Sequence, residues 1–307
     1  MSVKTAIVST VKTSRLELTS FVHYHLNTGI DLIILFFDDA EDPLLPVFRE
    51  YEQVAAIACG ADRRTSYGRY DTLPLAKRQI VNATRGLEIA RARGCDWLVH
   101  IDSDEFLESD QPVGALLAAS GRRVLRFDIQ EAVPENIESD FPYTEIRRFR
   151  RSVGRRYLWF CRMLGCPRAL FCGSYFRGHI ASKIAFRTDM EIESVGIHNV
   201  FGPNGKIPDS ACFSIRLLHF DSVTFTVWKH KWAMRSAAKE LNPKGRERYR
   251  DRQFKLYQRF VGDETNLKKV YGRIYLLTRY DKTVLGRLGM LRSFQLDPAL
   301  FESVKGK

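Results

Sequence analysis

The stretch HIDSDEF at residues 100–106 carries the side chains best placed to do chemistry. Asp102 and Asp104 stand two positions apart directly after an apolar run at 97–101, and residues two apart on an extended segment point the same way. Their carboxylates can therefore face a common point. Oxygen ligands of this kind suit Mg²⁺ or Mn²⁺, and such a cation can also bind a diphosphate. The competing interpretation is an acidic turn or helix cap that holds no ligand.

The elements before and after this stretch alternate between apolar strands and helices. We predict strands at 3–9, 31–37, 54–58, 97–101 and 124–127, and helices at 14–27, 43–52, 75–92 and 112–119. This alternation predicts an α/β fold with a mostly parallel sheet flanked by helices. Ligands of such sheets bind beyond the carboxyl ends of the strands, where Asp102 and Asp104 lie, as do Asp38 and Asp39 after the second strand. We expect both acidic clusters to belong to one site.

Composition excludes several classes of protein. With 307 residues, 45% hydrophobic and 27% charged, the chain is neither disordered nor fibrous. The longest apolar run, 32–37, is far shorter than the ~20 residues of a membrane helix, and residues 1–10 do not match a signal peptide. We expect a cytoplasmic protein, with peripheral contact at the inner face of the membrane as a further expectation. Six cysteines without a CxxC pair predict buried thiols.

The positive charge is concentrated near the C-terminus. Residues 226–307 carry 20 Lys and Arg against 8 Asp and Glu, which accounts for the whole net charge of +12. Their cations alternate with aromatic residues at helical spacing, so we predict a domain at 1–225 and a basic amphipathic helical extension at 226–307. Such a surface fits anionic lipid, a polyanionic substrate, nucleic acid or plain solvent. Six arginines at 147–156 predict a mobile basic loop.

An ordered series of motifs resembles one family, the glycosyltransferases of the GT-A fold, and within it the family-two-like group with a DxDEF metal motif. Residues 21–43 are similar to that group's helix, glycine, strand and acidic turn. Further matches follow in the family's order over about residues 5–235: Gln79, Trp97, Lys183, Ile184, Arg187, His198, LLHFDS and FTVWKHKWAMR. The resemblance implies a GT-A-like fold and transfer of a sugar, with inversion, from a nucleotide-diphosphate donor to an acceptor hydroxyl.

The resemblance also implies roles for the acidic residues. Asp102 and Asp104 match the motif that holds the metal and the diphosphate. Glu105, beside them, either supports these two or contacts the acceptor. Asp38 and Asp39 match the turn that holds the base or ribose of the nucleotide.

Four further positions match the donor side of the family's site. Gln79 lies in the helix before the metal strand. Lys183 and His219 match positions that face the diphosphate or the acceptor. His198 matches a late histidine that completes the metal shell, and imidazole beside carboxylates favours Mn²⁺ over Mg²⁺. A lone histidine with a purely structural role is the alternative for both histidines.

An inverting enzyme also needs a base near the acceptor hydroxyl, normally a carboxylate. Asp128 ends the fifth predicted strand and Glu131 follows three residues later, on the same edge of the sheet. Each is also compatible with a helix cap or a surface acid. Residues 129–150 contain no motif that identifies the acceptor, which we expect to be a glycan or glycolipid in surface polysaccharide or glycolipid synthesis.

Three other functions fit parts of the sequence. A nucleic-acid-binding protein would use the basic extension and the arginine cluster, but it leaves the acidic strand ends unexplained, so we expect no nucleic-acid partner. A glycoside hydrolase places its carboxylates ~5–9 Å apart across a bond, whereas acids two residues apart chelate better. A catalytically inactive scaffold would bind the nucleotide sugar without turning it over.

Overall fold

The computed structural model describes residues 3–60, 63–171, 181–237 and 248–303. Contacts divide the chain into two units. Unit 1 comprises Met1–Asp128, Ala181–Leu217 and Pro298–Lys307, and unit 2 comprises Ile129–Ile180 and Leu218–Asp297. The functional division after residue 225 stays a prediction, because compactness assigns no function to either unit.

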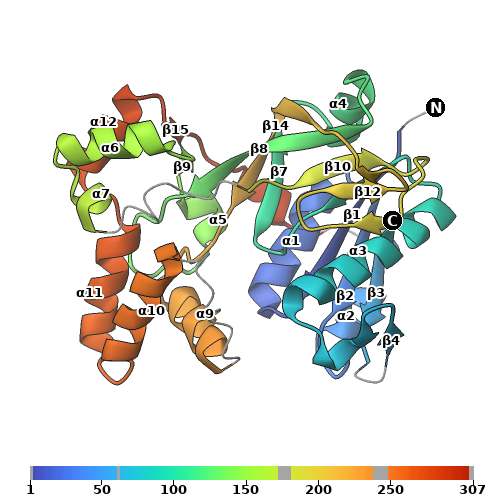
Figure 1. Ribbon diagram of the computed structural model, residues 1–307, viewed down its shortest axis with the longest axis horizontal. Coiled ribbons are helices and arrows are strands. Elements are labelled where there is room, and N and C mark those ends of the chain that lie inside the picture. The colour runs from blue at the N-terminus through green and yellow to red at the C-terminus, as the bar shows by residue number, and fades with distance from the viewer. Residues whose placement is uncertain (1–2, 61–62, 172–180, 238–247, 304–307) are drawn as a thin grey trace. The chain divides into compact units, whose positions relative to one another are not determined.

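Unit 1 is built on four parallel strands. They are β1 (Thr5–Val11), β2 (Leu32–Phe37), β3 (Val54–Ala58) and β6 (Trp97–His100). They lie in the order β6-β1-β2-β3, with every neighbouring pair parallel. Figure 1 labels β1, β2 and β3 of this sheet. The helices between them are α1 (Arg15–Asn27), α2 (Leu45–Arg49) and α3 (Leu75–Ala92). The predicted α/β class is confirmed, and these strands begin and end within two residues of the predicted positions.

The strand next to β6 runs the other way, and the strand beyond it is again parallel to β6. β10 (Ile184–Arg187) pairs antiparallel with β6 and with β8 (Val124–Ala132). β14 (Ser210–His219) pairs with β7 (Glu105–Ser109) and β8. Because β10 is antiparallel to β6, it begins where β6 ends, which brings residue 183 to the carboxyl edge of β6.

The remaining elements of unit 1 are short. They are β4 (Arg64–Thr65), β5 (Gly68–Arg69), the 3₁₀ helix η1 (Tyr70–Thr72), α4 (Val113–Ala119), β11 (Ser194–Val195), β12 (Val200–Gly202), β13 (Gly205–Lys206) and the 3₁₀ helix η2 (Pro298–Phe301). The last of them, η2, returns to α1, where Asn27 donates to the carbonyl of Leu300 and the ring of Tyr24 packs on Phe301. Residues 298–301 therefore belong to unit 1, although all of unit 2 precedes them in the sequence.

Unit 2 combines a small antiparallel sheet with helices. The end of β8 pairs with β9 (Arg148–Arg151), which pairs with β15 (Leu291–Ser293). The helices are α5 (Pro142–Glu145), α6 (Arg155–Met163), α7 (Pro167–Phe171), α9 (Phe225–Ala237), α10 (Arg248–Phe260), α11 (Glu264–Tyr275) and α12 (Arg279–Arg287). The prediction of a mobile loop at 147–156 is wrong, since this segment forms β9 and opens α6, with Phe149 and Arg150 buried.

The basic C-terminal region contains helices, as its pattern predicts, and their apolar faces are used inside unit 2. Trp228 and Trp232 on α9 pack with Tyr257 on α10 and Tyr271 on α11, and all four side chains are buried. In the part of the chain that the structure describes, no helix combines the length and the apolar composition needed to cross a membrane. The described cysteines are free and buried, and Cys172 lies outside the described residues.

The close packing of α3 on β1 inside unit 1 leads to a prediction about stability. Helix α3 lies so near β1 that a Cβ at Gly86 would come within 2.6 Å of Cγ2 of Val8. We expect Gly86→Ala to lower the free energy of unfolding by about 1–3 kcal/mol, as overpacking of a core does. Urea denaturation measures this change.

The matched control for Gly86 is Gly286 on α12, where an added Cβ meets nothing within 4 Å. Gly286→Ala is expected to raise the free energy of unfolding by about 0.5–1 kcal/mol through helix propensity. Equal effects of the two substitutions would contradict the close packing of α3 on β1.

Candidate functional site

The carboxyl ends of the parallel strands place several predicted residues on one edge of unit 1. Strand register aligns Val11 at the end of β1 with Phe37 at the end of β2, and the end of β6 lies against β1. Asp38 therefore follows β2 on the edge where the turn with Asp102 and Asp104 follows β6. Ligands of parallel sheets bind at this edge.

Asp102 is held from two directions. Its Oδ1 accepts a hydrogen bond of 2.9 Å from Nε2 of Gln79 on α3, and Nζ of Lys183 lies 2.7 Å from its Oδ2. Its backbone N–H donates to Oε2 of Glu105 at 2.8 Å. The hydroxyl of Ser103, the next residue of the turn, donates a hydrogen bond to Glu17 of α1. The structure thus brings Gln79, Asp102, Glu105 and Lys183 together.

A buried ammonium pairs with two carboxylates of this turn. Lys183 and Glu105 are each 2% exposed at the side chain, with Nζ 3.3 Å from Oε2, while the side chain of Asp102 is 35% exposed. Burial acts to lower the pKa of Lys183, but the carboxylates of Asp102 and Glu105 outweigh it and the pKa is raised. Lys183 therefore stays charged. Glu105 supports the turn from inside, and Asp102 is the one of these two carboxylates that reaches solvent.

Two histidines near this turn are neutral at pH 7. Nδ1 of His198 lies 3.0 Å from the carbonyl oxygen of Ser182, and burial together with the charge of Lys183 lowers its pKa. Burial and the same lysine lower the pKa of His100 to about 4. Because a carbonyl only accepts, Nδ1 of His198 carries the proton and Nε2 is the basic nitrogen.

The described residues include no group of three or more His, Cys, Asp or Glu side chains arranged to hold a cation, so Asp102, Asp104 and His198 do not form such a group. Both oxygens of Asp102 already face Gln79 and Lys183. Asp102 and Asp104 still fit the type of Mg²⁺ site that takes one or two carboxylates and completes its shell from substrate phosphates and water.

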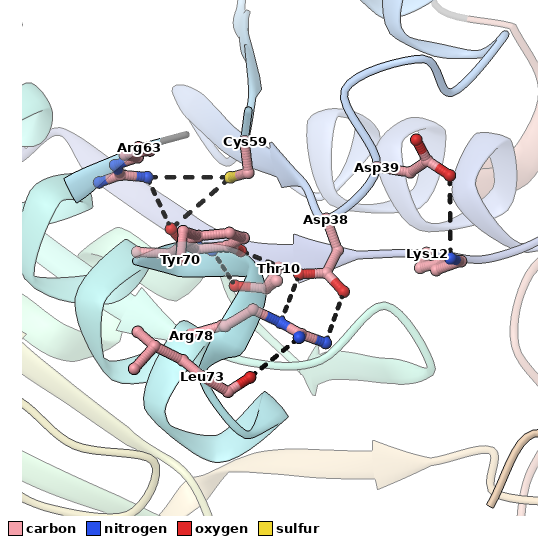
Figure 2. A network of polar contacts seen from close by, with 10 residues as sticks. Thr10, Lys12, Asp38, Asp39, Cys59, Arg63, Tyr70, Leu73 and Arg78 are labelled. Carbon is pink, nitrogen blue, oxygen red and sulfur yellow. Dashed lines mark hydrogen bonds and ion pairs between the residues drawn. The ribbon is translucent and has the colours of Figure 1, made fainter. Parts of the chain in front are cut away.

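The second acidic turn is organised by an internal network, shown in Figure 2. The carboxylate of Asp38 accepts from the hydroxyl of Tyr70 at 2.9 Å and pairs through two nitrogens with Arg78 of α3. Asn82 donates to the hydroxyl of Tyr70 at 2.8 Å. Both oxygens of Asp38 are therefore engaged by protein groups. Asp39 is about half exposed and lies 3.8 Å from Lys12, so it is the more accessible of the two.

In unit 2, two more predicted residues come together. Oε1 of Glu131 lies 3.2 Å from Nδ1 of His219, and both side chains are largely buried. Burial acts to raise the pKa of Glu131, but the hydrogen bond and charge of His219 and the charge of Arg150 lower it overall. Glu131 is therefore an ionised, buried carboxylate, which has the chemistry of a proton acceptor.

Asp128 and Glu131 do not share a face. Successive side chains of a strand alternate between its two sides, so residues three apart on β8 point to opposite faces. Asp128 also belongs to unit 1 and Glu131 to unit 2. The two carboxylates are therefore alternatives for the base and not a pair.

Several residues with evident roles were not predicted. Tyr70, Arg78 and Asn82 form the network around Asp38, and Arg126 holds Asp209 through two hydrogen bonds of 2.8 Å while it donates to the carbonyl of His198. A signal existed for two of them: Arg78 precedes Gln79 on α3, and Arg126 is a charged residue inside an apolar strand pattern.

No protein-family model and no curated protein matches this sequence. In structure, the chain is similar to HddC from Yersinia pseudotuberculosis, with 10% identity and a TM-score of 0.36 over 74% of this chain and 97% of that one. It is also similar to S. aureus TarS 1-349 in complex with UDP, with 12% identity and a TM-score of 0.38 over 86% of this chain and 73% of that one. Similarities at this level carry no functional argument.

Proposed function

We propose that the protein is a glycosyltransferase that moves a sugar from a nucleotide-diphosphate donor to an acceptor hydroxyl. The observation that carries this proposal is the turn after β6. Its partly exposed Asp102 is fixed by Gln79, Glu105 and the buried Lys183 at the ligand edge of a parallel sheet. An acidic turn with only a capping role would not require a buried ammonium and a helix amide to orient one carboxylate. The ordered resemblance over residues 5–235 supports the same function.

On the donor side, the chain's residues position a diphosphate and a nucleoside. A divalent cation, Mn²⁺ or Mg²⁺, bound at Asp102 and Asp104 would neutralise the charge that grows on the leaving diphosphate. Neutral His198 lies in the same region of unit 1. Asp39, beside Lys12, is the accessible carboxylate for the ribose or base. Asp38 keeps Arg78 and Tyr70 in place.

On the acceptor side, Glu131 is the residue that we assign as the base. In an inverting reaction the acceptor oxygen bonds to the anomeric carbon as the bond from that carbon to the diphosphate breaks, and the hydroxyl proton passes to the base. Glu131 is ionised and His219 fixes one of its oxygens. A glycan or glycolipid is the acceptor class, with surface polysaccharide or glycolipid synthesis as the setting.

A thermal-shift panel tests the donor. A ligand that binds only the folded protein adds about 2.7 kcal/mol of stability at 100 times its dissociation constant. We expect one nucleoside diphosphate and its sugar conjugates to raise the melting temperature, and EDTA to reduce this shift. Release of that nucleoside diphosphate from the sugar conjugate, measured in a coupled assay, separates a transferase from an inactive scaffold.

Each other outcome of the panel has a definite meaning. A nucleotide shift that EDTA leaves unchanged would remove the metal from the proposal and keep the donor. If no nucleotide shifts the melting temperature and RNA or DNA binds in a salt-sensitive manner, the proposal is wrong and the nucleic-acid function replaces it.

A further inference from the structure

Helix α6 in unit 2 exposes its large apolar side chains. Leu158 and Cys161 point inward and pack with Val153 and Leu285 in the core of the unit. Trp159 is 64% exposed and Met163 is 66% exposed. The α6 surface, as we define it, consists of Tyr157, Trp159, Phe160, Met163, Leu164 and Leu170, which are all exposed.

The spacing of these residues makes a continuous stripe on the outside of α6. Trp159 and Met163 are four residues apart, as are Phe160 and Leu164, and residues at this spacing are neighbours on a helix. A helix at the surface of a globular protein normally places charged residues there. The outer side of α6 instead carries bulkier apolar groups than its buried side, which marks an interaction surface.

The charged residues of α6 and of the segments beside it in the sequence are all positive. Arg151, Arg155, Arg156 and Arg162 are exposed in or next to α6. The sequence contains no Asp or Glu from residue 146 to residue 188. A surface with tryptophan and methionine at its centre and arginines at its edges is complementary to a bilayer that contains anionic lipid.

The C-terminal helices hold the excess charge, but the aromatic residues that join α9, α10 and α11 are covered. Trp228 and Trp232 on α9 are no more than 2% exposed, and Tyr257 and Tyr271 are buried with them. These four aromatic side chains are therefore not available to a membrane. Of the four tryptophans of the chain, all of which the structure describes, Trp159 is the exposed one.

We propose that the α6 surface is a peripheral membrane contact that binds bilayers containing anionic lipid. Trp159 and Met163 enter the headgroup region, while Arg155 and Arg156 pair with lipid phosphates and keep their charged ends in water. The contact is independent of donor binding, so it can be tested separately from the proposed function.

Vesicle flotation tests the position and chemistry of the contact. We expect the protein to float with phosphatidylcholine vesicles that contain roughly 30% phosphatidylglycerol, and not with pure phosphatidylcholine. One arginine near an anionic surface contributes about fivefold in affinity, so Arg155→Glu with Arg156→Glu should lower the partition constant by about 25-fold or more. Acidic residues suit the first turn of a helix, so α6 should still form.

The matched control carries the same charge change on the C-terminal helices. Lys255→Glu with Arg259→Glu alters two exposed cations on α10, and we expect the partition constant to change by less than about twofold, because the proposed contact is made by α6. Equal loss in both double variants would overturn the assignment to α6. Absence of vesicle binding by the wild-type protein would overturn the proposal as a whole.

Tryptophan fluorescence tests insertion directly. Addition of anionic vesicles should shift the emission to shorter wavelength, and Trp159→Phe should remove the shift while vesicle binding persists. Sedimentation without lipid tests whether a second copy of the protein covers this surface instead of a membrane. A wild-type dimer that becomes a monomer in the Trp159→Ser, Met163→Ser variant would show that a second copy covers α6, and would overturn the membrane contact.

Discussion

Replacing Asp102 by asparagine is expected to lower the rate of sugar transfer by about 10²- to 10³-fold, the usual cost of removing one preorganised charge from a transition state. The substitution keeps the size of the side chain and its hydrogen bond from Gln79, and it removes the charge that faces Lys183 and the donor. Nucleotide-sugar turnover and calorimetric titration with the donor nucleotide, each with and without Mn²⁺, measure the effect.

The design of this test separates chemistry from folding. Lys183 keeps Glu105 as its partner in the Asp102→Asn variant, so urea denaturation should show a folded protein. The matched control is Asp110→Asn, which makes the same chemical change at a side chain that is 86% exposed, and we expect it to leave turnover unchanged. Donor affinity that is unaltered in both Asp102→Asn and Asp104→Asn would refute the role of this turn.

Replacing Glu131 by glutamine is expected to lower kcat by about 10²- to 10⁴-fold, the contribution of a positioned general base. Glutamine keeps the shape of the side chain and cannot accept the acceptor's proton. Steady-state kinetics should show the loss in kcat with little change in the KM for the donor. If Asp128→Asn shows the loss and Glu131→Gln does not, the base is Asp128.

The pH profile gives this assignment a second readout. His219 and Arg150 lower the pKa of Glu131, so the carboxylate stays ionised below the ordinary range of a glutamate, and activity should fall only as pH falls through that lowered pKa. The stability that the ionised Glu131 contributes is likewise present above its pKa in the unfolded chain and lost as pH falls through the folded value. In the His219→Gln variant, the imidazole no longer opposes the effect of burial, so the pKa of Glu131 should rise. The acidic limb of the pH–activity profile should then move to higher pH.

Much of unit 1 was predictable, because its elements are local patterns. The apolar run at 31–37 became β2, and the helix predicted at 75–92 has the same ends as α3. The antiparallel β10 was not predicted, because its four residues resemble any short apolar segment and its pairing with β6 is a tertiary contact. The ion pair of Asp102 with Lys183 was not predicted for the same reason. The fold, and not the local sequence, brings these two distant residues together.

The amphipathic pattern predicted helices near the C-terminus, but it does not identify which residues pack on their apolar faces. Trp228 and Trp232 have the spacing of a surface-binding helix, yet they meet aromatic residues of α10 and α11 inside unit 2. In the arginine cluster, repeated charges suggested a solvated loop. Strand pairing to β8 and β15 buried Phe149 and Arg150 instead, which no local pattern reveals.

The return of η2 to α1 has a consequence for biosynthesis. Asn27 and Tyr24 meet residues 300 and 301, which the ribosome adds only after all of unit 2 has been made. At translation rates of about 5–20 residues per second, roughly 10–30 s pass between synthesis of the N-terminal strands and synthesis of η2. During this interval the side of α1 that carries Tyr24 and Asn27 lacks its partner.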